Sequence, residues 1–196
     1  MPNRKTLIDD LINALTCLPG VGKKTAQRMT YHLLQRAKDD ALNLSDVLKE
    51  VVTSTVNCKL CRNLSQENIC DLCSDDGRDN SMLCIVESPA DVFNMENSTN
   101  YNGKYFVLLG KLSPLDGIGP KEIGLDILED KISSGVVSEL ILAVNYTVES
   151  DVTAHVISEI ALKNSIKVTR LAQGVPVGGE LEYLDQYTLS KAFDKR

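Results

Sequence analysis

Four cysteines have the spacing of a metal site. Cys58 and Cys61 form one Cys-x2-Cys pair, Cys70 and Cys73 form a second, and eight residues separate the two pairs. Each pair fits a tight knuckle, and two knuckles bring four thiolates into the tetrahedron that Zn²⁺ takes at closed structural sites. Because such a tetrahedron has no open position for a substrate, the pattern predicts a structural zinc ion, one per chain.

Disulfides are the alternative use of these cysteines. The sequence shows no signal peptide and no run of the ~20 apolar residues that a membrane helix needs. We therefore expect a cytoplasmic protein with no membrane partner, and the reduced thiols of that compartment favour metal over disulfides. Cys17 and Cys84 lie outside the set in apolar runs, and we expect both to be buried.

A second stretch, LPGVGKKTAQRM, has the chemistry of an anion site. Gly20 and Gly22 allow positive φ and a close approach of the backbone to another chain. The N–H groups of the turn and of the next helix attract anions, and Lys23, Lys24 and Arg28 can complete a grip on phosphate. We interpret the stretch as a helix-hairpin-helix that binds the DNA backbone without reading bases. A plain helical turn with a glycine cap is the alternative.

The charge distribution bears on this interpretation. The chain has a net charge of −6, but residues 1–38 hold seven Lys or Arg and two Asp, so this segment carries +5 and the remainder −11. A basic segment joined to an acidic body suits a protein whose basic part contacts phosphate. An ordinary solvated helix face would carry the same charges, so charge alone leaves both interpretations open.

A third candidate is the stretch LCIVESPADV, in which an apolar run ends at Glu87. In the Toprim fold, a strand that ends in Glu and a second strand that ends in Asp-x-Asp hold Mg²⁺ through carboxylates. The matching strand here, ELILAVN, runs into Asn145 and Thr147 at the two acidic positions. Glu149 and Asp151 follow and compensate only weakly. The carboxylate pair for two-metal chemistry is therefore missing, and Mg²⁺ binding stays open.

One further segment, residues 110–124, carries glycines and lysines but lacks the G-x4-G-K-[ST] order of a phosphate-binding loop. It lies between an expected strand and a helix, on the rim where such sheets bind ligands. We favour a loop that faces a partner or DNA over a nucleotide site. His32 and His155 fall inside helical runs and form no pair with a nucleophile.

The periodicity predicts the scaffold that must position these residues. Residues 1–56 read as helices, the third of them capped by Asn43 or Ser45. Beyond residue 78, the strands MLCIVE, KYFVLLG, ELILAVN and IKVTRLA alternate with the helices DVFNMEN, KEIGLDILEDKIS and VTAHVISEIALKN. This alternation predicts an α/β fold with a mainly parallel sheet flanked by helices.

We expect four parts along the chain. They are a helix-hairpin-helix region at residues 1–56, a four-cysteine zinc finger at 57–78, a Toprim domain at 79–172, and a Gly-rich C-terminal segment with a short tail at 173–196.

Taken together, the motifs resemble the RecR family of bacterial recombination mediators over nearly the whole chain. LPGVGKKTAQRM is similar to that family's helix-hairpin-helix, and CKLCRNLSQENICDLC followed by LCIVESPADV is similar to its zinc finger and Toprim domain. YFVLLGKLSPLDGIGP and GVPVGGELEYLD are similar to two further signatures. The resemblance implies a protein that is not an enzyme and that forms a ring of four subunits around double- and single-stranded DNA. It also implies work with RecO and RecF in loading RecA onto gapped or single-stranded DNA at the bacterial nucleoid.

The resemblance also assigns residues. Lys24 and Arg28 match the family's DNA-contacting positions, the four cysteines match its zinc ligands, and Glu87 matches the Toprim glutamate, whereas Lys23 stands where relatives often have proline. The family usually reads Asn-Pro-Thr-Val-Glu-Gly-Glu where this chain reads NYTVESD. The loss of Pro and Gly at Tyr146 and Ser150 predicts a looser turn.

Three functions compete on these residues. The first is a DNA clamp without enzymatic activity, which we expect. The second is a Mg²⁺-dependent Toprim nuclease or primase that uses Glu87 with Glu149 or Asp151, and it predicts turnover that Glu87→Gln removes. The third, a zinc module that binds only proteins, leaves the LPGVGKK hairpin without an explanation.

Overall fold

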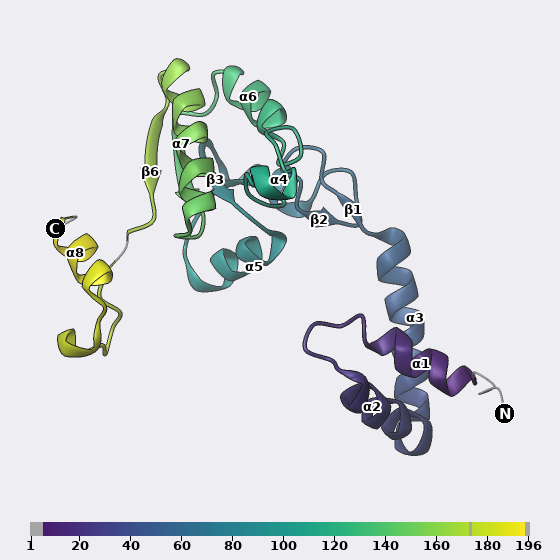
Figure 1. Ribbon diagram of the computed structural model, residues 1–196. Helices are drawn as coiled ribbons and strands as arrows, with labels where there is room; N and C mark the ends of the chain where they lie inside the picture. Colours follow the sequence, from purple (N-terminus) through teal and green to yellow (C-terminus); the bar gives the residue numbers. More distant parts are fainter. Residues whose placement is uncertain (1–5, 173, 195–196) are drawn as a thin grey trace. The chain divides into compact units, whose positions relative to one another are not determined.

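The computed structural model describes residues 6–172 and 174–194. The chain forms two compact units, Met1–Thr55 and Val56–Arg196 (Figure 1). The first unit is helical, and the second holds the cysteine pairs, the sheet and the C-terminal segment.

The described part of the first unit contains α1 (Leu7–Leu15), α2 (Lys23–Arg36) and α3 (Lys38–Ser54). A capping box starts α1, because the Thr6 side chain accepts from the Asp9 N–H and the Asp9 carboxylate accepts from the Thr6 N–H. Among residues 6–55, only Ala26 and Thr30 are buried. The helices therefore leave most of their apolar surface exposed.

The third helix begins earlier than its capping residues predict. The expected cap at Asn43 or Ser45 is wrong, because α3 already starts at Lys38. Ala37, with φ −142° and ψ 49°, interrupts the helical backbone for one residue, and the chain then re-enters a helix at once. Acidic side chains in the first turn of α3 favour this start, because they complement the positive end of the helix dipole.

The second unit opens with the cysteine module. It consists of the short antiparallel pair β1 (Val56–Asn57) and β2 (Leu64–Ser65), followed by the single-turn helix α4 (Asp71–Ser74). The four cysteines lie on the β1–β2 loop and at the start of α4.

A parallel four-stranded sheet follows, which confirms the predicted α/β fold. Its strands are β3 (Asp79–Val86), β4 (Gly103–Val107), β5 (Glu139–Ala143) and β6 (Lys167–Arg170), in the order β4-β3-β5-β6. The helices α5 (Pro89–Ser98), α6 (Leu125–Ser133) and α7 (Val148–Lys163) connect the strands and cover the sheet. A right-handed crossover through a helix is the usual way to join parallel strands.

The strands read as continuous apolar runs because both faces of the sheet are buried. Along β3, Leu83 and Ile85 point into the core that includes α6 and α7, whereas Cys84 and Val86 point into a second core that includes Val92 of α5. All four of these β3 residues are at most 1% exposed. The end of this strand is therefore held rigidly from both sides.

Two regions depart from regular helices. The helix predicted from residue 121 begins only at Leu125, because Gly124 adopts a left-handed conformation with φ +75°, and the 3-10 helix η1 (Pro114–Asp116) precedes it. The segment after β6 holds the 3-10 helix η2 (Leu181–Tyr183) and then α8 (Gln186–Asp194). Within the described residues, no helix combines the length and apolar character needed to cross a membrane.

Candidate functional site

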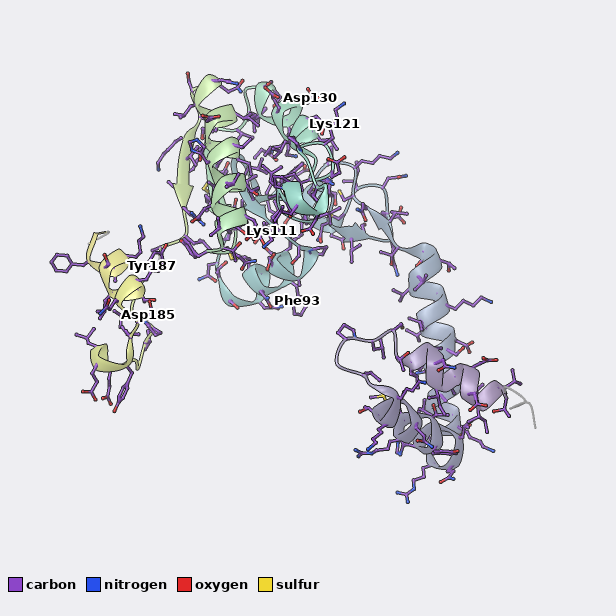
Figure 2. The ribbon with its side chains drawn as sticks, viewed as in Figure 1. Phe93, Lys111, Lys121, Asp130, Asp185 and Tyr187 are labelled. Carbon is purple, nitrogen blue, oxygen red and sulfur yellow. The ribbon has the colours of Figure 1, made fainter. Side chains whose placement is uncertain are left out.

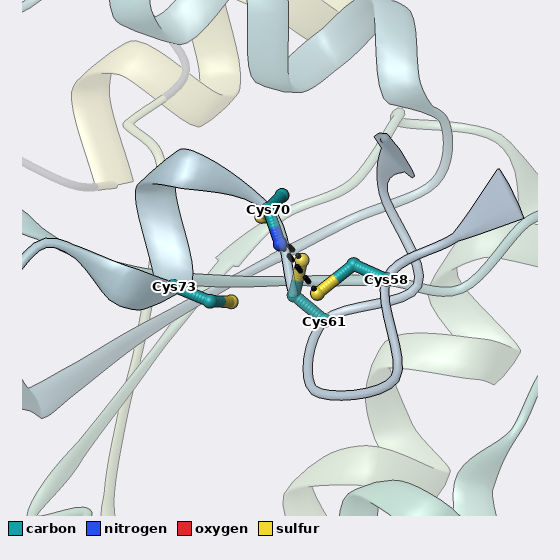
Figure 3. Close-up of side chains that lie close together, drawn as sticks. All are labelled: Cys58, Cys61, Cys70 and Cys73. Atoms are coloured by element: carbon teal, nitrogen blue, oxygen red, sulfur yellow. Dashed lines mark hydrogen bonds between the residues drawn. The ribbon is translucent and has the colours of Figure 1, made fainter. Parts of the chain in front are cut away.

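The four predicted metal ligands come together at one point. One sulfur from each of Cys58, Cys61, Cys70 and Cys73 lies within 4.8 Å of the others, and the first three residues are buried (Figure 3). The Sγ atoms of Cys61 and Cys70 are 3.5 Å apart. The Cys70 N–H donates to the Cys58 sulfur over 3.3 Å, the type of bond that stabilises a thiolate ligand.

Protons compete for this cluster when no cation is bound. A hydrogen bond with Cys73, together with burial, raises the pKa of Cys61, and burial raises the pKa of Cys70 to about 11. The hydrogen bond from Cys61 lowers the pKa of Cys73 to about 6. Four such close sulfurs cannot all be ionised without a cation. A soft set of four sulfurs with no oxygen ligand suits Zn²⁺.

The cysteine module is fixed to the edge of the sheet by Lys104, a residue that sequence reasoning missed. Only 8% of Lys104 is exposed. Its ammonium donates to the carbonyl oxygens of Leu72, Cys73 and Asp75, at 3.0, 3.1 and 2.7 Å. These are carbonyls at the end of α4 that have no partner within the helix. The sequence signal for Lys104 is its position at the start of the apolar run KYFVLLG, where a charged side chain needs buried partners.

The hairpin between α1 and α2 is exposed, and its two glycines differ. Gly20 has φ +77° and therefore needs the freedom of glycine, whereas Gly22 has φ −82° and is the N-cap of α2. The expectation of positive φ thus holds for Gly20 and is wrong for Gly22. Lys23 and Lys24 open α2, Arg28 lies one turn further on, and all three are exposed.

The two cysteines outside the cluster also differ. Cys84 is fully buried, as predicted, and burial raises the pKa of its thiol to about 12. Cys17 is exposed, which contradicts the prediction. The physical reason is that α1 ends at Leu15, so Cys17 lies in the hairpin turn and not on an apolar helix face.

At the carboxyl edge of the sheet, the Glu87 carboxylate is held by hydrogen bonds. Its Oε1 accepts from the Asn145 N–H at 2.9 Å and from the Ser150 hydroxyl at 2.6 Å, and its Oε2 accepts from the Asn145 side-chain amide at 2.6 Å. These donors follow β5 and begin α7. Glu87 thereby ties the end of β3 to the neighbouring turn.

The other two candidate carboxylates have separate cationic partners. The Lys111 ammonium, labelled in Figure 2, lies 3.2 Å from Glu149, and the Arg170 guanidinium lies 2.7 Å from Asp151. Hydrogen bonds within its turn and with Lys111 lower the pKa of the Glu149 carboxyl. Among residues 6–172 and 174–194, only the cysteine cluster gathers three or more potential metal ligands. The described carboxylates thus do not form the triad of a catalytic Toprim site.

The turn that departs from the family pattern has contacts of its own. The Arg170 guanidinium stacks over the Tyr146 ring at 4.1 Å from the centroid. The Tyr146 hydroxyl donates to the Leu171 carbonyl, and the Ser150 hydroxyl bonds to both Glu87 and the Thr147 hydroxyl. The predicted loosening is therefore opposed, because both replacement side chains bridge the turn to neighbouring elements.

Comparisons with known proteins agree with this organisation. A family described as "RecR, helix-hairpin-helix" matches residues 8–52, "Toprim domain" matches 81–172, and "RecR, C-terminal" matches 174–196. "Recombination protein RecR" of Methylococcus capsulatus is 55% identical over 189 residues, which cover 96% of each chain. Proteins of the same name from Saccharophagus degradans and Alcanivorax borkumensis are 53% and 50% identical over 190 residues, covering 97% of this chain and 96% and 95% of theirs. Since about half of all residues are identical along nearly the full length of both chains, this chain belongs to the RecR family.

Proposed function

We propose that this chain is a non-enzymatic, DNA-binding recombination mediator. The observation that carries the proposal is the exposed hairpin, in which Gly20 turns the chain into the start of α2 and three basic side chains follow. The N–H groups at a helix start and cations beside them bind phosphate oxygens. The relatives carry recombination in their names, which supports the same role here.

A hollow along α2 supports a longer track for the DNA backbone. Its volume is about 570 Å³. The lining residues are Thr25, Arg28, Met29, Tyr31, His32, Gln35 and Arg36. Arg28, His32 and Arg36 recur every four residues, so they follow one side of the helix. Because these groups would contact phosphate and not base edges, binding should show little sequence preference and a steep dependence on salt.

For the cysteine cluster we propose a structural zinc ion. Its ligands would be Cys58, Cys61, Cys70 and Cys73, and the closed sulfur set would hold the module in its fold without offering a coordination site to a substrate. The chain would then divide into a DNA-binding region at 1–56, a zinc finger at 57–78, a Toprim domain at 79–172 and a C-terminal segment at 173–196.

For the assembly we propose the four-subunit ring of the family. Exposed apolar side chains on α3 support an interface between copies: Leu42, Leu44, Val47, Leu48, Val51 and Val52. The C-terminal segment offers further exposed apolar side chains, those of Val177, Leu181, Tyr183 and Tyr187; Figure 2 labels Tyr187. Exposed apolar side chains that gather on one element are typical of protein interfaces.

RecO and RecF are the protein partners that we propose, in the loading of RecA onto gapped or single-stranded DNA at the nucleoid. The charge asymmetry supports separate surfaces for DNA and for protein partners. Residues 39–196 carry a net charge of −11, which repels DNA and attracts basic protein surfaces, whereas residues 1–38 carry +5.

Charge reversal at the hairpin tests the DNA proposal. The double variant Lys24→Glu and Arg28→Glu should weaken DNA binding by more than about tenfold and lower the slope of log affinity against log salt by about two, because two phosphate contacts are lost. Reversal of two exposed lysines of the second unit that lie outside residues 110–124, Lys163→Glu and Lys167→Glu, is the control and should leave both values unchanged.

Two results would overturn the proposal. Unchanged affinity of the hairpin variant, with normal metal content and mass, would contradict the assignment of the hairpin. Mg²⁺-dependent turnover of DNA that Glu87→Gln abolishes would replace the mediator by a Toprim nuclease or primase.

A further inference from the structure

The side chain that follows the second cysteine of the first pair bridges to the sheet. The Arg62 guanidinium donates to the carbonyl oxygens of Leu108 at 3.0 Å, of Glu122 at 3.1 Å and of Ile123. It also lies 5.9 Å from the centroid of the Phe106 ring. Three carbonyl acceptors on one planar guanidinium fix its position and its orientation.

These acceptors belong to the two ends of one segment. Leu108 directly follows the last residue of β4, and Glu122 and Ile123 come just before α6. Between them, Ser113 and Ile118 form an isolated antiparallel bridge, and an apolar hollow of about 330 Å³ lies against this segment. We call residues 109–121 the rim loop. One guanidinium therefore holds the ends of the rim loop together, as the base of a compact surface loop requires.

The space around Arg62 is fitted to its side chain. A Cβ added to Gly124 would collide with the Arg62 guanidinium, and Gly124 itself has φ +75°. The glycine thus serves both the left-handed turn before α6 and the approach of the guanidinium.

The backbone of Arg62 depends on the cysteine knuckle. Arg62 has φ +64°, which is uncommon for a residue with a Cβ. Its N–H donates to the Cys58 carbonyl at 2.8 Å, and the neighbouring Cys61 carbonyl accepts from the Val107 N–H at 2.8 Å. The same knuckle that places two sulfurs of the cluster therefore fixes the direction in which the guanidinium leaves the chain.

We propose that Arg62 is a positioning residue that couples metal binding at the cysteine cluster to closure of the rim loop. With metal bound, the knuckle holds Arg62 in its left-handed conformation, and the guanidinium clamps the loop at both ends. Loss of the metal frees the knuckle, which releases the clamp and opens the loop. This coupling rests on the proposed metal site and adds a conformational consequence to it.

Hydrogen exchange of the full chain, as purified and after treatment with a chelator, tests the coupling. Chelation should accelerate exchange of amides in the rim loop by at least about tenfold, with no change in β5. Arg62→Gly keeps the left-handed backbone without strain and removes the clamp. It should therefore show fast exchange in the loop even with one metal ion bound, and chelation should add no further change there.

Gly124→Ala provides a second variant that leaves Arg62 and the knuckle intact. Its Cβ displaces the guanidinium, so the same fast exchange is expected with full metal content. Because this change also forces an alanine to φ +75°, Arg62→Gly carries the test and Gly124→Ala supports it. Lys131→Gln is the matched control, because it removes the other side-chain bond from α6 to the knuckle, the one to the Leu60 carbonyl. It should leave exchange in the loop unchanged.

The outcomes separate the two proposals. No metal in the purified wild-type protein would overturn the metal site and the coupling with it. One metal per chain combined with slow exchange in the loop of Arg62→Gly, or with equal effects of chelation in wild type and variant, would overturn the coupling alone.

Discussion

Glu87 stands at the position of the Toprim glutamate, but its neighbours are hydrogen-bond donors and not further carboxylates. Three hydrogen bonds from Asn145 and Ser150 satisfy both of its oxygens. A carboxylate in this situation holds a turn against a strand end, and it has few lone pairs left for a cation.

Replacement of Glu87 by Gln should therefore lower stability and leave function intact. The Gln amide would place a donor against the Asn145 amide, and bonds to a charged acceptor would be lost. We expect the free energy of unfolding to fall by about 2 kcal/mol in denaturant titrations, with unchanged DNA affinity. Glu149→Gln is the control: Glu149 itself is exposed and its ion pair with Lys111 is open to solvent, so little change is expected. Equal stability of Glu87→Gln and wild type would contradict a structural role of Glu87 in holding the end of β3 to the turn after β5.

The two hairpin glycines give a matched pair of variants at the scale of an element. Neither would bring a Cβ within 4 Å of another atom, so only the backbone conformation distinguishes them. Gly20→Ala forces an alanine to φ +77°, which costs about 1–2 kcal/mol, whereas Gly22→Ala meets an ordinary φ of −82°. In a binding titration, Gly20→Ala should weaken DNA binding about five- to thirtyfold. Gly22→Ala should stay close to wild type, and similar losses in both variants would contradict this account.

The cysteine module should release its metal in acid. Metal binding requires deprotonated thiols, and the raised pKa values of Cys61 and Cys70 mean that both are protonated near neutral pH in the metal-free chain. Each of these two protons should therefore contribute about a tenfold rise in affinity per pH unit, or about a hundredfold per unit for the pair.

Below pH 6 the loss should become steeper, because Cys73, whose pKa is about 6, then also takes up a proton. The stability contributed by the metal is thus present at neutral and higher pH and disappears as pH falls. Competition with a chelator at several pH values measures this slope. An affinity that does not vary with pH would show that the thiols are not the ligands.

The sequence predicted those elements that are determined by the pattern of neighbouring residues. Short apolar runs that alternate with helical segments predicted all four strands of the sheet, and Cys-x2-Cys pairs predicted the cluster. It did not predict the start of α3, because a single irregular residue, Ala37, decides it. Contacts between distant segments were also missed: Arg62 and Lys104 act across 29 or more positions along the chain, and no local spacing reveals such partners.

At the scale of the whole molecule, the exposed apolar side chains of α3 support the assembly proposed above. Leu44, Leu48 and Val51 lie on one side of this helix, and each is 46% exposed or more. Burial of such a side chain contributes about 1.5–3 kcal/mol. Association of copies of the chain through α3 would therefore be favourable in free energy.

Charges placed on this helix should dissociate the assembly. The variant Leu48→Asp and Val51→Asp should shift the mass measured by light scattering from an oligomer toward a single chain. Lys49→Asp on the same helix changes charge without removing apolar area, and we expect its mass to match wild type. If the double variant keeps the oligomeric mass, α3 is not an interface.

The bond between the Cys61 carbonyl and the outer edge of β4 has a consequence for protein quality control in the cell. β4 is an edge strand with the sequence GKYFV, which ends in three apolar residues, and unpaired strands of this kind are templates for aggregation. The cysteine module covers that edge at Val107, so newly made chains that lack metal would present it to one another. If the proposed metal site is correct, the supply of metal would then limit the yield of folded protein, independently of any contact with DNA.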